Sequence, residues 1–237
     1  MSTSIRTLPH MFKQIPVRPQ TSRNFAYLAG CEETGKGILV DPAFDQDLFL
    51  NEIETEDLDL EWILNTHGHH DHTSANQAVK QSTGAKVANH PIDQVTSDRD
   101  LEHGDELSTG TLTVRTLHTP GHTEGSCCFL MNEKILVSGD TLFVGKLGGT
   151  SNSGKDARQQ YESLHNVLMK LPDDTSVYPG HDYGPMPHST IEWERKHNPF
   201  VRQNSFEQFC QLKKNWKQEK AKWESYWQDL LRENNGE

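Results

Sequence analysis

Residues 66–73 read T-H-G-H-H-D-H-T, the densest group of metal-ligand-type side chains in the sequence. A short apolar segment, E-W-I-L-N-T (61–66), runs straight into it and has the character of a strand. The segment that follows, T-S-A-N-Q-A-V-K-Q-S (73–82), has the character of a helix. Loops between such elements often carry function because the scaffold holds them rigidly. The stretch therefore predicts a site at the end of a strand.

The spacing within this cluster suits metal binding. His67 and His69 are two positions apart, so in an extended turn both side chains can aim at one ion. Asp71 and His72 follow at the start of the helix and can aim at a second point nearby. His70 is expected to point away from its neighbours. Imidazole nitrogen combined with carboxylate oxygen favours zinc, iron or manganese.

Three later positions repeat the same layout. His122 lies in T-P-G-H-T, Asp140 in S-G-D-T and His181 in Y-P-G-H-D, each after a predicted strand. The adjacent glycines let the backbone bend sharply and approach closely. We expect these strand ends to converge on the first cluster. Asp41, in V-D-P, is either a partner that orients a histidine or a turn residue before proline.

Composition restricts the class of protein. The chain has 237 residues and a formal net charge of -11, which argues against non-specific binding to nucleic acid or anionic membranes. It has no apolar stretch of transmembrane length and no apolar core of a signal peptide near its start. Its four cysteines form no C-x-x-C pair, and the adjacent Cys127 and Cys128 would face opposite sides of a strand. These features predict a cytoplasmic protein.

The remaining pattern predicts a mixed α/β sandwich with sheets inside and helices outside. Residues 126–131 and 134–140 are expected to form a hairpin around Asn132-Glu133, and residues 156–170 a helix. The last 35 residues form an amphipathic pattern, with apolar side chains at Phe206, Phe209, Leu212, Trp216, Trp223, Trp227, Leu230 and Leu231. That helix is either an arm packed on the domain or a dimer contact; its mixed charges disfavour a membrane-surface role.

The motifs together resemble the metallo-β-lactamase superfamily. T-H-x-H-x-D-H, T-P-G-H-T-x-G-S, G-D-T-L-F and G-H-D-Y stand in the family's order, over roughly residues 24–200. Within the family, the chain is similar to the glyoxalase II and persulfide dioxygenase branch. The resemblance implies a four-layer αββα sandwich with a C-terminal helical extension, divided into a domain at 1–202 and an extension at 203–237.

The resemblance also implies a ligand set. His67, His69 and His122 would hold one metal, while Asp71, His72 and His181 would hold the other, with Asp140 bridging them. The cofactors are then two divalent ions, zinc or alternatively iron or manganese. The persulfide dioxygenases instead use a single Fe(II), held by the residues that match His67, His122 and Asp140.

Two activities follow from this branch. The first is a metal-dependent hydrolase whose metal-bound hydroxide attacks a thioester such as an acyl-glutathione, with Asp71 orienting the nucleophile and taking up its proton. The alternative is an iron dioxygenase acting on glutathione persulfide or another low-molecular-weight persulfide. A non-catalytic metal-binding module is a third option. The expected partner is a small molecule, without nucleic acid or membrane; a homodimer remains open.

One segment departs from the branch. Glyoxalase II and the dioxygenases usually follow G-D-T-L-F with G-C-G-R or G-C-G-K, whose basic residue contacts the glutathione carboxylate. Here residues 144–155 read V-G-K-L-G-G-T-S-N-S-G-K. Lys146, Lys155 and Arg158 are the candidate substrate-binding residues in its place, with plain surface charge as the alternative. The helical glutathione-binding domain of full-length glyoxalase II also has no counterpart between His181 and Ser189.

Overall fold

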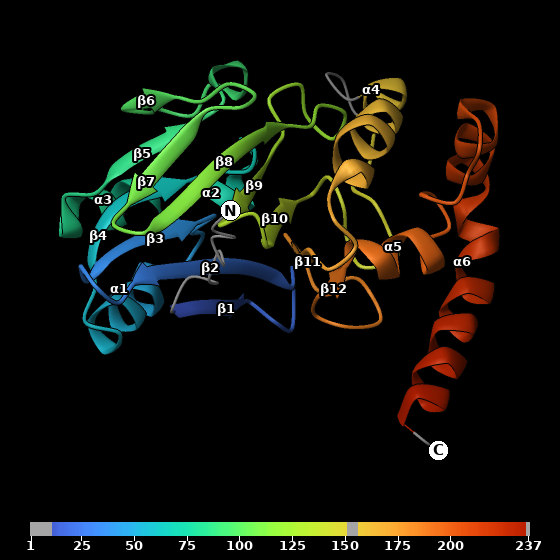
Figure 1. Cartoon of the computed structure of the whole chain (residues 1–237), viewed down its shortest axis with the longest axis horizontal. Helices are drawn as coiled ribbons and strands as arrows, with labels where there is room; N and C mark the ends of the chain where they lie inside the picture. Colours follow the sequence, from blue (N-terminus) through green and yellow to red (C-terminus); the bar gives the residue numbers. More distant parts are fainter. Residues whose placement is uncertain (1–10, 151–155, 236–237) are drawn as a thin grey trace, which may run out of the picture.

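The computed structural model describes residues 11–150 and 156–235, and its centre is a pair of six-stranded sheets (Figure 1). The first sheet has the order β1 (Met11–Val17), β2 (Asn24–Cys31), β3 (Lys36–Val40), β4 (Asp59–Leu64), β5 (Lys86–Asn89) and β6 (Arg99–Asp100). The second has the order β12 (Ser189–Thr190), β11 (Ser176–Pro179), β10 (Ile135–Gly139), β9 (Cys127–Met131), β8 (Leu112–His118) and β7 (Glu106–Thr109).

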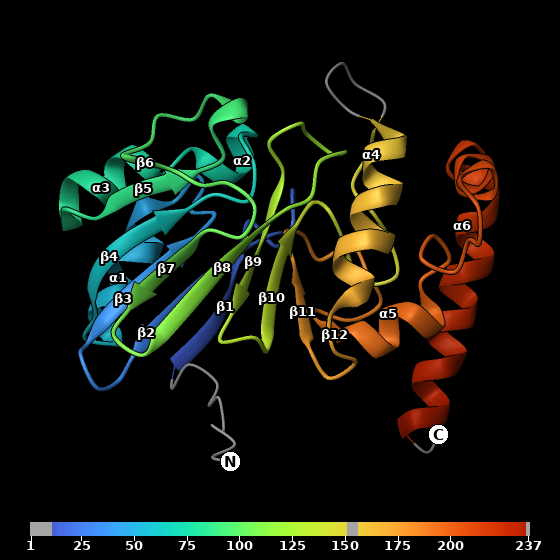
Figure 2. The same ribbon diagram turned by 45° about the horizontal axis from the view of Figure 1, so that its top comes forward.

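Helices cover the outer face of each sheet. The first sheet is covered by α1 (Gln46–Thr55) and α3 (Asn76–Thr83), and the four-residue helix α2 (His70–Thr73) lies at its end (Figure 2). The second sheet is covered by α4 (Ala157–Glu162), α5 (Ile191–His197) and, outermost, the long α6 (Phe206–Asn235). A short 3₁₀ turn, Pro91–Asp93, follows β5. The predicted four-layer αββα sandwich with a C-terminal helical extension is confirmed.

Three apolar layers hold the sandwich together. Between the sheets, Tyr27 and Ile38 of the first pack with Phe129 and Val137 of the second. Outside the first sheet, side chains of β2 and β3 pack with α1 and α3. Outside the second sheet, Leu164, Leu168 and Phe209 belong to the third layer, which joins the helices to β8–β11. Alternate residues along each strand serve opposite layers because side chains alternate in direction.

The hairpin and the cysteine predictions are confirmed. Strands β9 and β10 pair antiparallel, and Asn132 and Glu133 at the turn have φ of 45° and 56°. Two successive left-handed residues give the hairpin the twist of its strands. Cys127 belongs to the layer between the sheets and Cys128 to the outer layer, so the two side chains face opposite ways.

Two segments differ from expectation. Residues 156–170 are not one regular helix, because α4 ends at Glu162 and continues as a π-helical turn, Ser163–Val167, and a 3₁₀ turn, Leu168–Lys170. Leu164 and Leu168 are fully buried there, so packing outweighs the regular helical repeat. Strand β1 was not predicted; it pairs antiparallel with residues 24–30 of β2.

Helix α6 is packed on the body of the protein, as the arm interpretation predicts (Figure 1). Phe209 and Trp227 are 0% and 1% exposed, and Phe209 lies in the apolar layer with Phe200. The boundary between 202 and 203 and the homodimer stay predictions. Within the described residues, every helix is too short or too polar to cross a membrane.

Candidate metal centre

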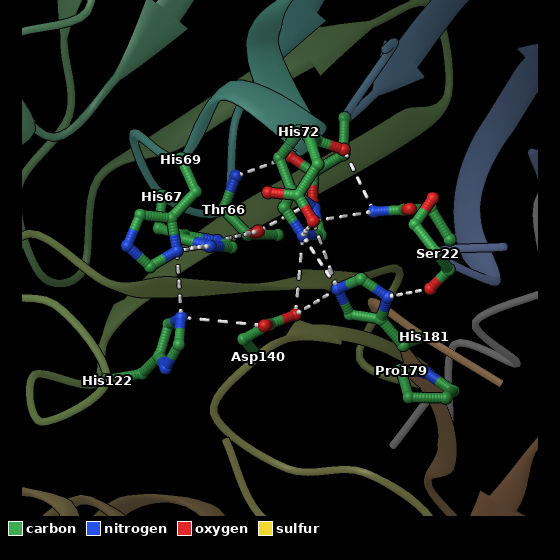
Figure 3. Close-up of polar contacts among 12 residues, drawn as sticks. Ser22, Thr66, His67, His69, His72, His122, Asp140, Pro179 and His181 are labelled. Carbon is green, nitrogen blue, oxygen red and sulfur yellow. Dashed lines mark hydrogen bonds and ion pairs between the residues drawn. The ribbon is translucent and has the colours of Figure 1, made fainter. Parts of the chain in front are cut away.

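Seven predicted ligand side chains meet at one edge of the sandwich (Figure 3). They come from the segment after β4, from α2 and from the loops after β8, β10 and β11, and they are His67, His69, Asp71, His72, His122, Asp140 and His181. Strands β10 and β11 run parallel, which brings their carboxyl ends to the same edge. The topology therefore supplies the convergence that the sequence predicted.

The first group consists of three histidines. Nδ1 of His69 lies 2.9 Å from Nε2 of His67 and 3.0 Å from Nε2 of His122. The ring nitrogens of all three side chains face a common point, with the rings of His69 and His122 nearly perpendicular at 88°. A tetrahedral zinc ion with bonds of about 2.0–2.1 Å keeps its ligand atoms about 3.3 Å apart, so this spacing suits a metal ion.

The second group lies on the other side of Asp140 and contains one carboxylate. Nε2 of His72 is 3.2 Å from Nε2 of His181. Oδ2 of Asp71 is 3.5 Å from Nε2 of His181 and 3.9 Å from Nε2 of His72. Asn24 donates its Nδ2 hydrogens to the main-chain oxygen of Asp71 at 2.9 Å and to Oδ2 at 3.2 Å, which fixes this carboxylate. A second divalent ion fits these three side chains.

Asp140 stands between the two groups and turns one oxygen to each. Its Oδ2 lies 3.5 Å from Nε2 of His122, and its Oδ1 lies 3.4 Å from Nε2 of both His72 and His181. Oδ1 is buried and has no hydrogen-bond partner among the described residues. A buried carboxylate oxygen is costly without a partner, and a bound cation would provide one. The arrangement is that of a carboxylate able to bridge two metals.

The histidines are oriented by acceptors on their outer nitrogens. Nδ1 of His122 donates to the main-chain oxygen of Gly149, and Nδ1 of His181 to that of Ser22, each at 2.9 Å. A proton on Nδ1 leaves the lone pair of Nε2 directed into the centre. This arrangement is the usual one behind metal-ligating histidines.

Asp41 is part of the same support, which decides between its two interpretations in favour of a partner that orients histidine. Its Oδ2 lies 3.1 Å from Nδ1 of His72, and Oδ2 also accepts the hydroxyl of Thr66 at 2.6 Å. The Thr66 oxygen in turn lies 3.1 Å from Nδ1 of His67. A single carboxylate, that of Asp41, therefore orients one histidine of each group. The main chain of Asp41 is in the left-handed region, with a φ of 54°.

Charge within the centre is balanced by close opposite partners. Burial works against ionisation of Asp140, yet His72 and His181 hold its pKa well below the usual value. Burial lowers the pKa of His67 far below its usual value, so this imidazole is neutral and able to bind a metal. Burial also lowers the pKa of His72, but Asp140 and Asp41 outweigh it and raise the pKa to about 9. When no cation is bound, the negative charges of Asp140 and Asp41 stabilise the protonated form of His72.

Two glycines allow the close approach. A Cβ atom on Gly180 would lie 2.5 Å from Oδ1 of Asp140 and 3.0 Å from His72. A Cβ atom on Gly148 would overlap the main-chain oxygen of Asp140 and lie 2.9 Å from Nδ1 of His122. The chain can pass this close to the candidate ligands only where it has no side chain.

Asp93 is a supporting residue that the sequence analysis missed. Its Oδ2 accepts the main-chain N–H of Gly68 at 2.8 Å and the hydroxyl of Thr123 at 2.7 Å, and its Oδ1 accepts the N–H of Gly125 at 3.0 Å. One carboxylate thus ties the loop of His67 and His69 to the loop of His122. It stands in an ordinary P-I-D turn, so no sequence signal marked it.

The predicted substrate-binding residues lie in different surroundings, and only one of those described lines the cavity. Nζ of Lys146 lies 3.1 Å from Oε1 of Glu224 on α6, and burial lowers the pKa of this lysine. The guanidinium of Arg158 lies over the ring of Phe206, 3.9 Å from its centroid. Lys155 falls outside the described residues. Of the two that are described, Lys146 lines the cavity beside the centre and Arg158 does not.

A cavity of about 870 Å³ opens beside the metal centre and extends to α6. Phe143 and Tyr183 line it where they contact His181, with ring centroids 5.8 Å and 4.5 Å from that imidazole. Gly148 and Gly149, which contact His122, line it as well. His181 and His122 therefore lie just beyond this lining, so a molecule in the cavity can present one end to the centre.

A family model described as the metallo-beta-lactamase superfamily matches residues 22–181, a range that contains all seven candidate ligands and ends before α5 and α6. The chain is 41% identical over 167 residues to the hydroxyacylglutathione hydrolase of Polaromonas sp. (strain JS666), a match that covers 68% of this chain but only 63% of that relative. The chain thus spans less than two thirds of that relative's length.

Relatives with another named activity are similar too. The chain is 32% identical over 183 residues to the human mitochondrial persulfide dioxygenase ETHE1, covering 75% of this chain and 71% of that protein. The crystal structure of ETHE1 from Myxococcus xanthus superposes with a TM-score of 0.81 at 36% identity, covering 87% of this chain and 91% of that one. The chain is therefore similar to proteins with different named reactions.

Proposed function

This chain belongs to the metallo-β-lactamase superfamily, and on that basis we propose that it is a binuclear metallohydrolase that cleaves thioesters. The observation that carries the proposal is the position of Asp140. Its two oxygens face separate groups of nitrogen ligands, one at 3.5 Å from His122 and the other at 3.4 Å from His181. Each side of Asp140 therefore has enough ligand side chains for one ion, which supports a centre with two.

The proposed ligand roles follow the two groups. His67, His69 and His122 hold the first ion, and Asp71, His72 and His181 hold the second. Asp140 contributes one oxygen to each. Two divalent ions at these positions would make hydroxide available near neutral pH and polarise the carbonyl of the substrate.

Asp71 is the proposed proton acceptor among the carboxylates. Its side chain is 37% exposed, compared with 10% for Asp140 and 1% for Asp41, so it is the one that water can reach. Burial works to raise its pKa, but His72 and the Asn24 hydrogen bond lower the value below normal. The group is therefore ionised near neutral pH and able to orient a water, and its exposure is what makes it the proposed proton acceptor.

Support for a thioester as the substrate comes from two sides. The Polaromonas relative is named a hydroxyacylglutathione hydrolase. The cavity beside the centre also carries basic side chains where α6 lines it, which suits a substrate with a reactive group at one end and negative charge at the other.

Persulfide oxidation by a single iron is the second candidate. His67, His122 and Asp140 form a set of two histidines and one carboxylate on one side of the centre, a combination typical of oxygen-activating iron sites. The similarity to human persulfide dioxygenase points the same way. In this case the group of Asp71, His72 and His181 would have no metal to hold.

Metal analysis combined with two activity assays separates the candidates. Protein purified without added metal is expected to contain two metal ions per chain and to hydrolyse acyl thioesters without consuming oxygen. One iron per chain, together with oxygen consumption in the presence of glutathione persulfide and no thioester hydrolysis, would overturn the hydrolase proposal in favour of the dioxygenase.

A further inference from the structure

The cavity next to the metal centre has a charge opposite to that of the whole protein. Its lining includes five cationic side chains, Arg23, Lys146, Lys213, Lys214 and Lys220, and one anionic side chain, Glu224. The chain as a whole carries 34 acidic residues against 23 basic ones. A local excess of positive charge in an acidic protein indicates a site for an anion, because the rest of the surface repels it.

The single acid of the lining is already engaged. Oε1 of Glu224 lies 3.1 Å from Nζ of Lys146 and 3.5 Å from Nζ of Lys220. Arg23 is paired with Asp182 at 3.1 Å, and Lys213 donates to Gln160 at 2.5 Å. Lys214 and Lys220 are both exposed side chains of α6 on the lining, and Lys220 makes the longer of the two contacts with Glu224. These two are therefore the cations best placed to pair with an incoming anion.

Aromatic side chains supply the other part of the lining. Phe200, Trp216 and Trp227 face the cavity at its α6 end, and the rings of Phe200 and Trp216 are 4.7 Å apart. Phe200 and Trp227 are 4% and 1% exposed, so the partly exposed ring of Trp216 is the one that can contact an aromatic or apolar ligand group. Cations and aromatic rings together suit a ligand tail that carries both negative charge and a planar or apolar portion.

We propose that this cavity binds the anionic tail of the substrate's thiol carrier, and that α6 determines which carrier is accepted. The inference rests on the proposed thioester hydrolysis. It assigns a binding role to a helix that lies beyond the family match, which ends at residue 181. Five cations against two acids, Glu224 and Asp182, leave an excess of three positive charges. Glutathione has two carboxylates and one ammonium group, so this excess favours a phosphate-bearing carrier such as coenzyme A.

The geometry connects this tail site to the chemistry. Phe143 and Tyr183 stand between the cavity and His181, and Gly148 stands between the cavity and His122. A carrier whose charged end pairs with Lys214 and Lys220 therefore extends its sulfur toward the centre. Binding energy gained at the tail would hold the thioester in position for attack.

Paired variants of α6 test the proposal. Lys214→Ala combined with Lys220→Ala removes two exposed cations of the cavity. The matched control, Lys222→Ala combined with Arg232→Ala, removes two exposed cations of the same helix that do not line it. Both double variants change the net charge equally, so a general field effect would act on both. Calorimetric binding of free coenzyme A and of S-methylglutathione is measured with the metal-loaded protein, and KM and kcat with the corresponding acetyl thioesters.

The tail site predicts a selective loss of affinity. In the cavity variant, the Kd of the preferred free carrier and the KM of its thioester should rise about tenfold, with kcat changed less than about twofold. The control should stay within about twofold of the unmodified protein. If the affinity for coenzyme A shows this response, phosphate is the recognised group. If the affinity for the glutathione carrier shows it, carboxylate is the recognised group.

Other outcomes are equally informative. Equal shifts in both double variants, no shift in either, or no binding of either carrier would overturn the proposed tail site. Hydrolysis of thioesters in that situation would leave the proposed function standing. Conversely, carrier binding that is lost in the cavity variant, in a protein that hydrolyses no thioester, would uphold the tail site and reject the proposed function.

Discussion

Trp227 of α6 lies directly against the backbone of Gly145, in the loop that leads to the metal centre. A Cβ atom on Gly145, where φ is 71°, would lie 2.6 Å from the indole ring. The indole Nε1 donates to the main-chain oxygen of His197 at 3.1 Å. The C-terminal helix thus packs on the segment that carries Lys146 and Gly148, and so it forms one wall of the cavity as well as an arm on the surface.

Removing this indole should destabilise the protein. Trp227 is 1% exposed, and Trp227→Ala is expected to lower the free energy of unfolding by about 3–5 kcal/mol, because a large cavity is left and a hydrogen bond is lost. Urea unfolding measures this. Trp223→Ala, on the same helix at a partly exposed position, is the control and should cost clearly less. Equal losses in the two variants would contradict the anchoring role of Trp227.

Asp93 should matter for metal affinity although it contacts no candidate ligand side chain. Asp93→Ala leaves the N–H groups of Gly68 and Gly125 and the hydroxyl of Thr123 without their acceptor. We expect a loss of about 1–3 kcal/mol in unfolding free energy. We also expect metal affinity to fall about 10- to 100-fold, as for other outer supports of metal ligands. Thermal unfolding and a competition assay with a chelator measure the two effects.

A control for Asp93 comes from the first helix. Asp45 caps α1 by accepting the N–H of Leu48 at 3.2 Å, a bond within the start of one helix rather than between the two ligand-bearing loops. Asp45→Ala should cost about 1 kcal/mol and leave metal affinity unchanged. Retention of normal metal affinity in Asp93→Ala, despite a measurable loss of stability, would show that Asp93 supports the fold alone.

Glu194 makes stability depend on pH. Its carboxylate is fully buried, and burial raises its pKa to about 7, against hydrogen bonds from Ser189, Asn198 and Gly145 that lower it. The pKa of Glu194 in the folded protein exceeds the unfolded value of 4.5. Its contribution to the free energy of unfolding is therefore complete below pH 4.5 and is lost as pH rises to about 7. The loss amounts to about 3 kcal/mol.

Glu194→Gln removes this titration while keeping the shape of the side chain. The amide can donate to the Ser189 hydroxyl and still accept from Asn198, which now donates at 2.8 Å. The free energy of unfolding in urea is measured between pH 4.5 and 8. The difference between the variant and the unmodified protein should grow in favour of the variant up to about pH 7 and stay constant above it. Parallel curves over the whole range would rule out a raised pKa for Glu194.

Much of the fold followed from local patterns. The turn at Asn132-Glu133 was predictable because two residues between apolar strands favour a tight hairpin, and α6 because its apolar residues recur at helical spacing. Strand β1 was missed because M-F-K-Q-I-P-V mixes polar residues with Pro16, which suits only an edge strand. Its pairing with β2, rather than its own pattern, makes it a strand.

The candidate metal centre was likewise predictable from the sequence only in part. His67, His122 and Asp140 were predictable because each is a ligand-type residue just after a strand. Asp93 and the cavity wall of α6 were not, since their roles depend on which distant segments the fold brings together. Asp93 lies 30 residues from Thr123 in sequence, and Lys146 lies 78 residues from Glu224.

The metal content of Asp140→Asn tests the binuclear centre most directly. The substitution keeps the shape of the side chain but removes the negative charge of the carboxylate. The two oxygens of that carboxylate face His122 and His181. Asp41→Asn is the control, because Asp41 is also a buried carboxylate but contacts His72 on its outer nitrogen. We predict two metal ions per chain by mass spectrometry in the unmodified protein and in Asp41→Asn at saturating metal, and one or none in Asp140→Asn. Two tightly held ions in Asp140→Asn, or a single ion at saturation in the unmodified protein, would contradict the bridging role.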